Sequence, residues 1–343
     1  MEIRSRAPLR LGLAGGGTDL PTFCKNYGGT VFSATIGMYA YCTIKPTNNN
    51  RIKIISFDNN DSIDCPSISN LSISDNKLIL HKGVYNRIVK EFNNGKPLSF
   101  TMSTSNDAPI GSGLGTSSTM IVAILEAFDK WLKLGLSKYQ KAKIAYEIER
   151  IDLNLSGGKQ DQYSAVFGGF NLIEFNKDDS VVVNSLRINE DNIEELECSL
   201  LLFYCGISRS SSKIIDDQIK KTEQKNMKTL KALNKLKDYA LQIKNAIILG
   251  DFKKFARVLN LAWINKKKTS AVITNTRLNN LIDYIKNNGA EAVKISGAGG
   301  GGILMIYFNP INRQKLINAL TKLEGHFYPV KFTQHGVSSW IIN

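Results

Sequence analysis

Alternating apolar and polar positions mark strands along the first hundred residues. Within residues 3–13, Leu9 and Leu11 share one face of the expected strand, while Arg10 and Gly12 share the other. Similar alternation predicts three further strands, and helical spacing predicts one helix: strands at 30–46, 51–58 and 98–104, and the helix at 81–93. The first part of the chain is therefore expected to form a sheet with a helix against it.

A helical period replaces this alternation near residue 118. Apolar residues recur at helical spacing over 118–134 and predict a helix there. Ser137 begins a second predicted helix, which runs to about Arg150, because Gln140 three residues later completes a capping-box pattern. A glycine-rich connection then enters a strand within 155–175.

The second half of the chain follows a polar, acidic stretch near residues 180–195. We place a domain boundary in this stretch and expect two domains, 1–185 and 186–343. The elements predicted after it are a strand at 198–206, long amphipathic helices over 210–288, a strand–glycine loop–strand unit at 290–308, a helix at 310–323 and a final strand at 327–333. No internal repeat is visible, and the predicted class is α+β.

Length and composition narrow the class of protein. With 343 residues, 43% of them hydrophobic, the chain can bury a core in each of two domains. It contains neither the run of about 20 apolar residues that a membrane span needs nor a signal-peptide pattern, so we expect a cytoplasmic protein. The five cysteines include no C-x-x-C pair, and there are only three histidines. This composition does not indicate a zinc site or a Ser-His-Asp hydrolase.

The net charge of +14 allows two interpretations. A basic chain can bind nucleic acid. However, the lysines between 213 and 268 are spread along helical patterns, and we expect them on solvated helix faces. We therefore predict small anionic substrates as partners and no nucleic acid. We also expect no membrane partner, and a protein that is a monomer or a homodimer.

The stretch PIGSGLGTSSTM at 109–120 combines small residues and hydroxyls before an apolar helix. Glycines let backbone N–H groups approach a ligand, and a helix N-terminus adds unpaired donors and partial positive charge. Such a loop is typical of phosphate binding, although an ordinary glycine-rich turn with an N-cap is the alternative. It is not a Walker A loop, because no lysine follows the glycines. GAGGGG at 297–302 matches G-x-G-x-x-G formally, but a strand follows it, which excludes a Rossmann motif.

Three glycine-rich segments stand in a specific order: 7–21, 109–118 and 294–302. This order resembles the GHMP kinases, whose central signature is P-x-x-x-G-L-G-S-S, with Thr116 here at the first serine. The resemblance covers nearly the whole chain. It implies two domains, an N-terminal ribosomal-protein-like α/β domain and a C-terminal ferredoxin-like α+β domain, and it implies ATP and Mg²⁺ as cofactors. The ATP-binding residues that it implies are Pro109, Gly111, Ser112, Gly113, Leu114, Gly115, Thr116, Ser117 and Ser118.

The resemblance also implies catalytic roles. Glu149 with Ser117 would hold Mg²⁺, and Asp161 would accept or orient the proton of the substrate hydroxyl. Arg150 departs from the family, whose sugar-kinase branch has histidine there. Arg10 would stabilise charge between donor and acceptor, with an exposed edge-strand arginine as the alternative. Lys159, near Asp161, would act on that carboxylate or on phosphate, or would be solvated.

The segment RAPLRLGLAGGGTDLPTF resembles most closely the D-glycero-D-manno-heptose 7-phosphate kinase branch, with fucose kinases as relatives. This implies phosphorylation of the anomeric hydroxyl to a 1,7-bisphosphate, for the synthesis of nucleotide-activated heptose and a surface polysaccharide. Asp19 would bind sugar hydroxyls, unless it only caps a helix, and Arg209 would hold the distal phosphate, unless it is an exposed arginine. The substrate-binding residues predicted in this way are Gly16, Gly17, Thr18, Asp19, Arg209, Gly297, Gly299 and Gly300.

Three other functions remain open from the sequence. A free-sugar 1-kinase of the fucose or galactose type would share the motifs but would need no second phosphate site. A sensor that binds ATP and sugar without turnover would not need Glu149, Asp161 and Arg10. An RNA-binding protein would use the ribosomal-protein-like half and the positive charge.

Overall fold

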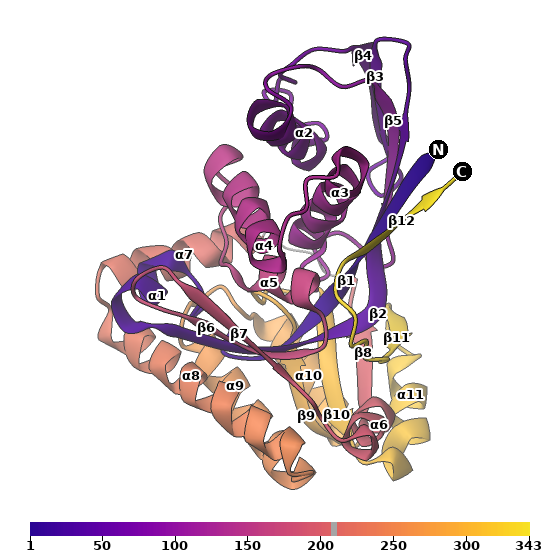
Figure 1. Ribbon diagram of the computed structural model, residues 1–343. Helices are drawn as coiled ribbons and strands as arrows, with labels where there is room; N and C mark the ends of the chain where they lie inside the picture. The colour runs from indigo at the N-terminus through magenta and orange to yellow at the C-terminus, as the bar shows by residue number, and fades with distance from the viewer. Residues whose placement is uncertain (207–210) are drawn as a thin grey trace.

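The computed structural model describes residues 1–206 and 211–343, which form two β-sheets with helices packed around them (Figure 1). The elements of the first part are β1 (Glu2–Ala14), α1 (Pro21–Tyr27), β2 (Gly29–Pro46), β3 (Arg51–Ser56), β4 (Asp61–Pro66), α2 (Ile79–Phe92), β5 (Phe100–Asn106), α3 (Thr116–Leu132), α4 (Lys138–Glu147), a π-helical turn (Ile148–Asp152), α5 (Gln160–Phe167), β6 (Phe170–Phe175) and β7 (Val181–Leu186).

The second part contains most of the remaining helices. Its elements are α6 (Glu190–Ser199), β8 (Leu200–Tyr204), α7 (Ser211–Glu223), α8 (Met227–Ile248), α9 (Phe252–Lys267), α10 (Thr276–Asn287), β9 (Ala290–Ile295), β10 (Ile303–Phe308), a 3₁₀ turn (Pro310–Asn312), α11 (Arg313–Leu320), β11 (His326–Pro329) and β12 (Ser338–Ile342).

The first sheet is organised by the long strand β2. Its strand order is β12-β1-β2-β5-β3-β4. Strand β5 pairs with residues 40–46 of β2, while β6 pairs with residues 29–34 of β2 and with β7. In this sheet β3 and β5 pair in parallel, and the other neighbouring strands pair antiparallel. Helix α3 is buried along nearly its whole length and packs on β1 and β2, with α2, α4 and α5 around it. This arrangement fixes the start of α3 near the end of β1.

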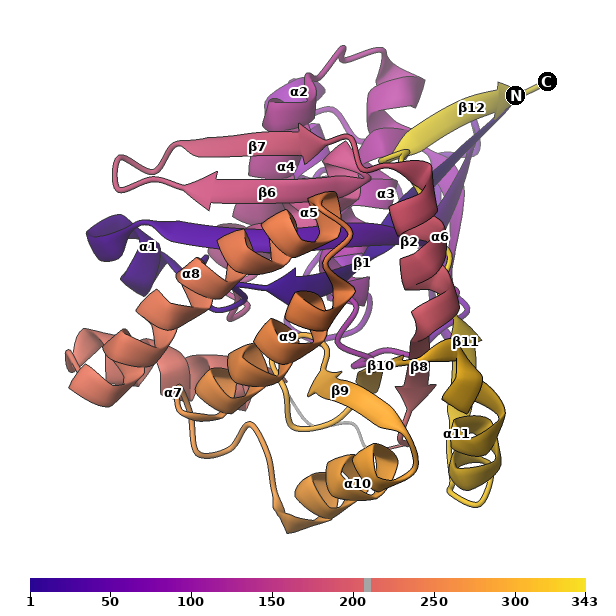
Figure 2. The same cartoon turned by 90° about the horizontal axis from the view of Figure 1, so that it is seen from below.

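The second sheet is antiparallel with the order β11-β8-β10-β9. A pair of long helices joins it to the first sheet: α8 contacts β1 and β2, and its partner α9 packs on β9 (Figure 2). The hydrophobic cluster that contains Leu9, Leu13 and Phe32 of the first sheet also contains Ile303 and Met305 of β10. The two sheets therefore share one of their cores.

The chain ends beside its own beginning. Strand β12 pairs antiparallel with β1, from Glu2 opposite Ile342 to Arg6 opposite Ser338. Both views place the two termini next to each other (Figures 1 and 2). The last strand, which is predicted to lie in the second domain by residue number, thus belongs to the first sheet.

Most predicted elements are confirmed, including the strand–glycine loop–strand unit formed by β9, residues 296–302 and β10. The prediction is wrong or incomplete at short elements. Residues 160–167 were expected to lie in a glycine-rich loop and form α5, while α1, β4, β7, α6 and β12 were not predicted. The acidic stretch at 180–195 contains all of β7 and the start of α6. Helix α6 forms there because Asn189 caps it and acidic residues suit its first turn.

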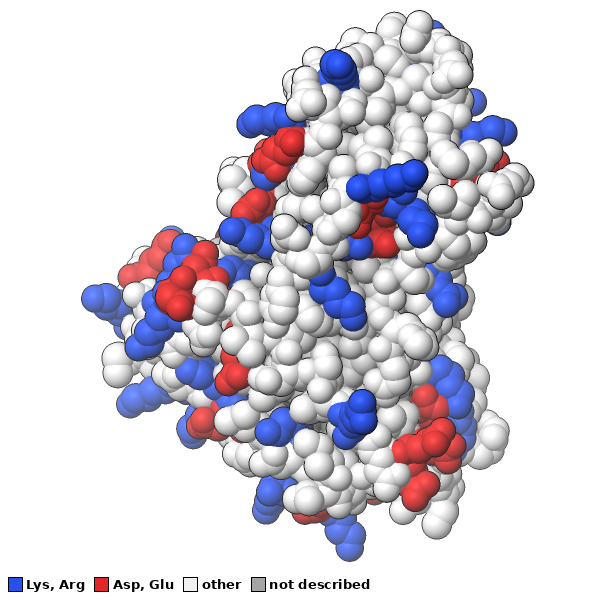
Figure 3. Space-filling model, in the orientation of Figure 1, with Lys and Arg blue, Asp and Glu red and all other residues white. Residues whose placement is uncertain are grey.

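Charge is distributed broadly over the molecule. On the face in Figure 3, Lys and Arg side chains are scattered among acidic and uncharged residues and form no continuous basic patch. Within residues 1–206 and 211–343, no helix has both the length and the apolar character that crossing a membrane requires.

Candidate active site

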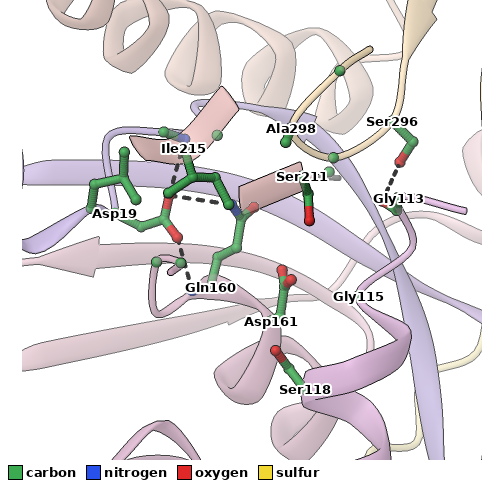
Figure 4. Close-up of a pocket in the computed structure, with 18 of the residues that line it drawn as sticks. Asp19, Gly113, Gly115, Ser118, Gln160, Asp161, Ser211, Ile215, Ser296 and Ala298 are labelled. Atoms are coloured by element: carbon green, nitrogen blue, oxygen red, sulfur yellow. Dashed lines mark hydrogen bonds between the residues drawn. The ribbon is translucent and has the colours of Figure 1, made fainter. Parts of the chain in front are cut away.

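The three glycine-rich segments of the sequence meet around one cavity of about 440 Å³. Its wall is formed by the end of β1 and the following turn, by the loop from β5 into α3, and by the loop between β9 and β10 (Figure 4). Helices α7, α8 and α9 close one side of it. The predicted residues that line the cavity are Arg10, Gly16, Gly17, Asp19, Gly111, Gly113, Gly115, Thr116, Ser117, Ser118, Glu149, Asp161, Gly297 and Gly299.

The loop before α3 requires glycine because of its backbone conformation and its neighbours. Gly111, Gly113 and Gly115 have φ angles of 77°, 82° and 80°. A Cβ atom on Gly113 would lie 2.5 Å from the carbonyl oxygen of Ser296, so the second and third glycine segments touch here. Ser296 also donates a hydrogen bond of 3.0 Å to the Gly113 carbonyl (Figure 4). The loop is thereby fixed in front of the α3 N-terminus, where backbone N–H groups favour an anion.

Arg10 and Asp161 form the central charged pair of the cavity. Arg10 is 3% exposed, so the alternative of a solvated arginine is wrong. Its Nε and Nη2 atoms contact Asp161 Oδ1 at 2.7 and 2.6 Å, and Nη1 donates to the Gly113 carbonyl at 2.6 Å. Asp161 lies in the first turn of α5, and its Oδ2 would lie 3.3 Å from a Cβ on Gly115. The carboxylate therefore stands directly beside the predicted phosphate loop.

Glu149 provides a second, more deeply buried carboxylate. It lies in the π-helical turn and accepts hydrogen bonds of 2.6 Å from both Ser118 Oγ and Gln162 Nε2. Arg150 Nη1 lies 3.3 Å from its other oxygen. Burial raises the pKa of Glu149 above its ordinary value, against the opposing effect of Arg150. The structure brings Ser118 to Glu149, whereas Ser117, the predicted partner, is exposed at the cavity.

Asp19 faces the cavity from the turn after β1. Asp19 does not cap the helix that follows it, because Leu20 is the N-cap of α1 and no side chain caps that helix. Asp19 Oδ1 accepts from the Gly17 amide at 3.0 Å and from Gln160 Nε2 at 3.2 Å, and Oδ2 accepts from the Gln160 amide at 3.1 Å (Figure 4). Gly158 is confined here, since a Cβ on it would lie 1.9 Å from Asp19 Oδ2.

Several predicted residues lie beside the cavity instead of lining it. Lys159 is buried, forms an ion pair with Asp179 and lies over the Tyr146 ring at 5.3 Å, so it is not solvated. Thr18 donates to the carbonyls of Gly15 and Thr30 and fixes the turn. Pro109, Ser112, Leu114 and Gly300 belong to the two glycine loops but do not line the cavity. Arg209 lies outside the described residues.

Two lysines line the cavity that the sequence did not single out. Lys266 on α9 is 9% exposed, so its expected place on a solvated helix face is wrong. Its Nζ donates to the Gly16 carbonyl at 2.9 Å, while Nζ of Lys294 on β9 donates to the carbonyls of Gly12 and Leu13 at 2.6 and 3.1 Å. Burial lowers the pKa of Lys266 to about 8 and that of Lys294 to about 7.

Comparison with known proteins agrees with this architecture. Residues 79–169 match the GHMP kinases N terminal domain, and residues 240–325 match the GHMP kinases C terminal domain. The chain is 43% identical over 340 residues to the D-glycero-alpha-D-manno-heptose 7-phosphate kinase of Campylobacter jejuni, covering 99% of both chains. The chain belongs to the GHMP kinase family. Its fold is the two-domain fold of these kinases, and the family uses ATP.

Solved structures resemble this GHMP kinase over its whole length. A D-glycero-D-manno-heptose 1-phosphate kinase from Bacteroides thetaiotaomicron is 42% identical, covers 99% of both chains and superposes with a TM-score of 0.85. A Lactococcus lactis galactokinase complexed with galactose, at 16% identity and a TM-score of 0.77, covers 98% of this chain and 95% of its own. The latter likeness concerns the fold alone.

Proposed function

We propose that this GHMP kinase transfers the γ-phosphoryl group of ATP to the anomeric hydroxyl of D-glycero-D-manno-heptose 7-phosphate. The observation that carries the choice of acceptor is the 43% identity, over 99% of both chains, to the Campylobacter jejuni heptose 7-phosphate kinase. ATP and a sugar phosphate are then the small-molecule partners. Action in the cytoplasm, a role in surface polysaccharide synthesis and a monomeric or dimeric state stay predictions.

The nucleotide phosphates would bind at the loop before α3. Positive φ angles at Gly111, Gly113 and Gly115 support this, because they free the backbone for close approach to a ligand. The N-terminus of α3, a helix of 17 residues, would add partial positive charge and unpaired N–H groups. Phosphoryl transfer depends mainly on such positioning and charge neutralisation.

Asp161 would receive the proton of the attacking hydroxyl. The anomeric oxygen would form a bond to the γ-phosphorus as the bond to the β-phosphate bridging oxygen breaks, so that ADP leaves with that electron pair. Because Arg10 contacts Oδ1, the second oxygen beside Gly115 would accept the proton. Arg10 would also stabilise negative charge on the transferred group through its remaining donor capacity.

Glu149 and its neighbours fit a magnesium site. A buried carboxylate with a serine hydroxyl at 2.6 Å supplies hard oxygen ligands, and Mg²⁺ usually takes one or two carboxylates together with substrate phosphates. Among the described residues there is no cluster of three acidic, histidine or cysteine side chains that would form a complete protein cage. Glu149 with Ser118, or with the predicted Ser117, would hold the ion, which neutralises charge on the phosphates when bound.

Asp19 would orient the sugar. Its carboxylate is already fixed by the Gly17 and Gln160 donors, so it can accept hydroxyl hydrogen bonds without losing side-chain entropy on binding. This fits a polyol acceptor better than an apolar one.

The decisive experiment measures Mg²⁺-dependent ADP release with D-glycero-D-manno-heptose 7-phosphate, heptose 1-phosphate, unphosphorylated heptose, fucose and galactose. We expect turnover with the 7-phosphate and phosphorus NMR of the product to show a new anomeric phosphate. Turnover of the 1-phosphate instead would place the new group at the other end of the sugar. Preference for a free sugar would favour a fucose- or galactose-type kinase, and ATP binding without turnover would favour the sensor.

A further inference from the structure

Lys266 and Lys294 reach the cavity from different elements but converge on the same stretch of backbone. Lys266 donates to the Gly16 carbonyl, and Lys294 donates to the carbonyls of Gly12 and Leu13. The positive charge of Lys266 is close enough to Lys294 to contribute to lowering its pKa. Arg10 acts on both lysines in the same direction, whereas Asp19 raises the pKa of Lys266.

Lys266, which is buried, and Lys294, which is partly buried, differ from the buried Lys82 and Lys159 in lacking an acidic partner. Lys82 pairs with Asp75 at 2.6 Å, and Lys159 pairs with Asp179. In the part of the chain that the structure describes, Lys266 and Lys294 make no ion pair with a carboxylate, although Asp19 is near Lys266. A buried ammonium group without a counter-ion costs several kcal/mol, and a bound anion would offset that cost.

We infer that Lys266 and Lys294 hold the phosphate group that the sugar acceptor already carries. This inference rests on the proposed function and names the part of the cavity that recognises the acceptor's anionic end. The ATP phosphates have a separate place at the loop before α3, whereas Lys266 contacts the turn that carries Asp19. The acceptor would therefore lie between Asp161, at the reacting hydroxyl, and the two lysines, at its phosphate.

The donors needed for a phosphate are present. An ammonium group has three donors, so Lys266 keeps two after its bond to Gly16 and Lys294 keeps one after its bonds to Gly12 and Leu13. Trp263 lies three residues before Lys266 on α9 and also lines the cavity. Its indole N–H is buried and is not accessible to a ligand, so Trp263 contributes only its ring to this wall.

The test compares Lys266→Met and Lys294→Met with wild type and with Lys268→Met, a control at an exposed lysine just after α9. We expect kcat/KM for heptose 7-phosphate to fall about tenfold to a hundredfold in either cavity variant, the usual range for a lost hydrogen bond to a charged group. For unphosphorylated heptose, kcat/KM and the KM for ATP should change less than about threefold. Lys268→Met should behave as wild type.

A second variant and a binding measurement separate the possible failures. If Lys266→Met folds poorly, Lys266→Arg replaces it in the test. Lys266→Arg keeps the positive charge and should retain part of the preference for the phosphorylated sugar. Calorimetry of heptose 7-phosphate without nucleotide tests the lysines independently of turnover. Equal loss on both acceptors, or unchanged selectivity, would overturn the lysine assignment. A wild-type protein that binds the sugar phosphate through these lysines but releases no ADP would overturn the proposed function alone.

Discussion

At the scale of single residues, the site depends on charges whose neighbours come from distant parts of the sequence. Arg10 meets Asp161 and the Gly113 carbonyl, and Asp19 meets Gln160. These charged side chains lie at the reacting groups, whereas the predicted nucleotide site is formed by the backbone of the loop before α3. Removing one charge should therefore impair the chemical step more than nucleotide binding.

Asp161→Asn is expected to lower kcat by about 10² to 10⁴, since the amide cannot accept the hydroxyl proton. Calorimetry should find the affinity for ATP nearly unchanged, because the phosphate loop is intact. Asp178→Asn, an exposed carboxylate that binds Ser180 in a turn, is the matched control and should keep full activity. A kcat for Asp161→Asn within threefold of wild type would remove Asp161 from the chemical step.

Recognition of the phosphorylated acceptor should depend on pH. The lysine pKa values of about 8 and about 7 mean that both groups are charged well below pH 7 and that Lys294 first, then Lys266, loses its proton as the pH rises through these values. The ratio of kcat/KM for heptose 7-phosphate to that for unphosphorylated heptose should therefore fall between pH 6.5 and 9. Asp19 opposes and Arg10 reinforces the shift at Lys266. A ratio that stays constant across this range contradicts the expectation.

Some site residues were predictable and others were not, for a physical reason. Glycines, Asp19, Glu149 and Asp161 stand in local motifs whose spacing is visible in the sequence. Lys266 sits in a run of three lysines, and only the packing of α9 against α8, β9 and the turn after β1 decides which of them is buried. The signal that could have found Lys294 is its position at the start of the third glycine segment, where the predicted strand ends.

At the scale of elements, the loop between β5 and α3 combines unusual backbone with close packing. Gly115 has a φ of 80° and would bring a Cβ within 3.2 Å of Asp161, whereas Gly135 has a φ of 69° with nothing within 4 Å of a Cβ. The two glycines therefore share backbone strain but differ in what surrounds them.

Gly115→Ala and Gly135→Ala are expected to lower the free energy of unfolding by a similar amount, about 1 kcal/mol, from the left-handed backbone conformation. Only Gly115→Ala should also lower kcat, by tenfold or more, because the methyl group displaces Asp161. Chemical denaturation and ADP release measure the two effects separately. If both variants lose activity equally, strain alone accounts for the loss.

Long elements were predictable and short ones were not. The spacing of apolar residues identified β1, β2, α3 and most later helices. Helix α5 has only 8 residues and follows glycines, so local propensity favoured a loop, while contacts with α3 and α4 stabilise the helix. Strand β12 forms because its partner, β1, lies at the opposite end of the sequence. Neither the packing of α5 on α3 and α4 nor the pairing of β12 with β1 is visible from the local sequence pattern.

At the scale of the whole molecule, the cavity lies where two sheets and the α8–α9 pair meet, so its geometry depends on the entire chain. The tail after β11 crosses back to the first sheet. The Thr333 N–H donates to the Thr35 carbonyl, the Thr333 carbonyl accepts from the Gly169 N–H, and the ring centroids of Phe332 and Phe170 lie 4.8 Å apart. Strand β12 is the last of these attachments.

Removal of residues 338–343 is expected to lower the free energy of unfolding by about 1–3 kcal/mol, as five cross-strand positions opposite β1 are lost. Activity at low temperature should persist, because no residue of β12 lines the cavity. Removal of Asn343 alone, which follows the last paired residue, is the control. A melting temperature equal to that of the control would show that β12 contributes little.

The pairing of β1 with β12 also determines when the first sheet can be completed during synthesis of the protein. Strand β1 is synthesised long before β12, so its outer edge stays without a partner until β12 has emerged from the ribosome. At about 5–20 residues per second, that wait lasts on the order of tens of seconds. Arg4 and Arg6 lie on β1 opposite β12 and put positive charge along this unpaired edge. Charged edge strands resist pairing with other chains, so we expect these arginines to disfavour such pairing until β12 is in place.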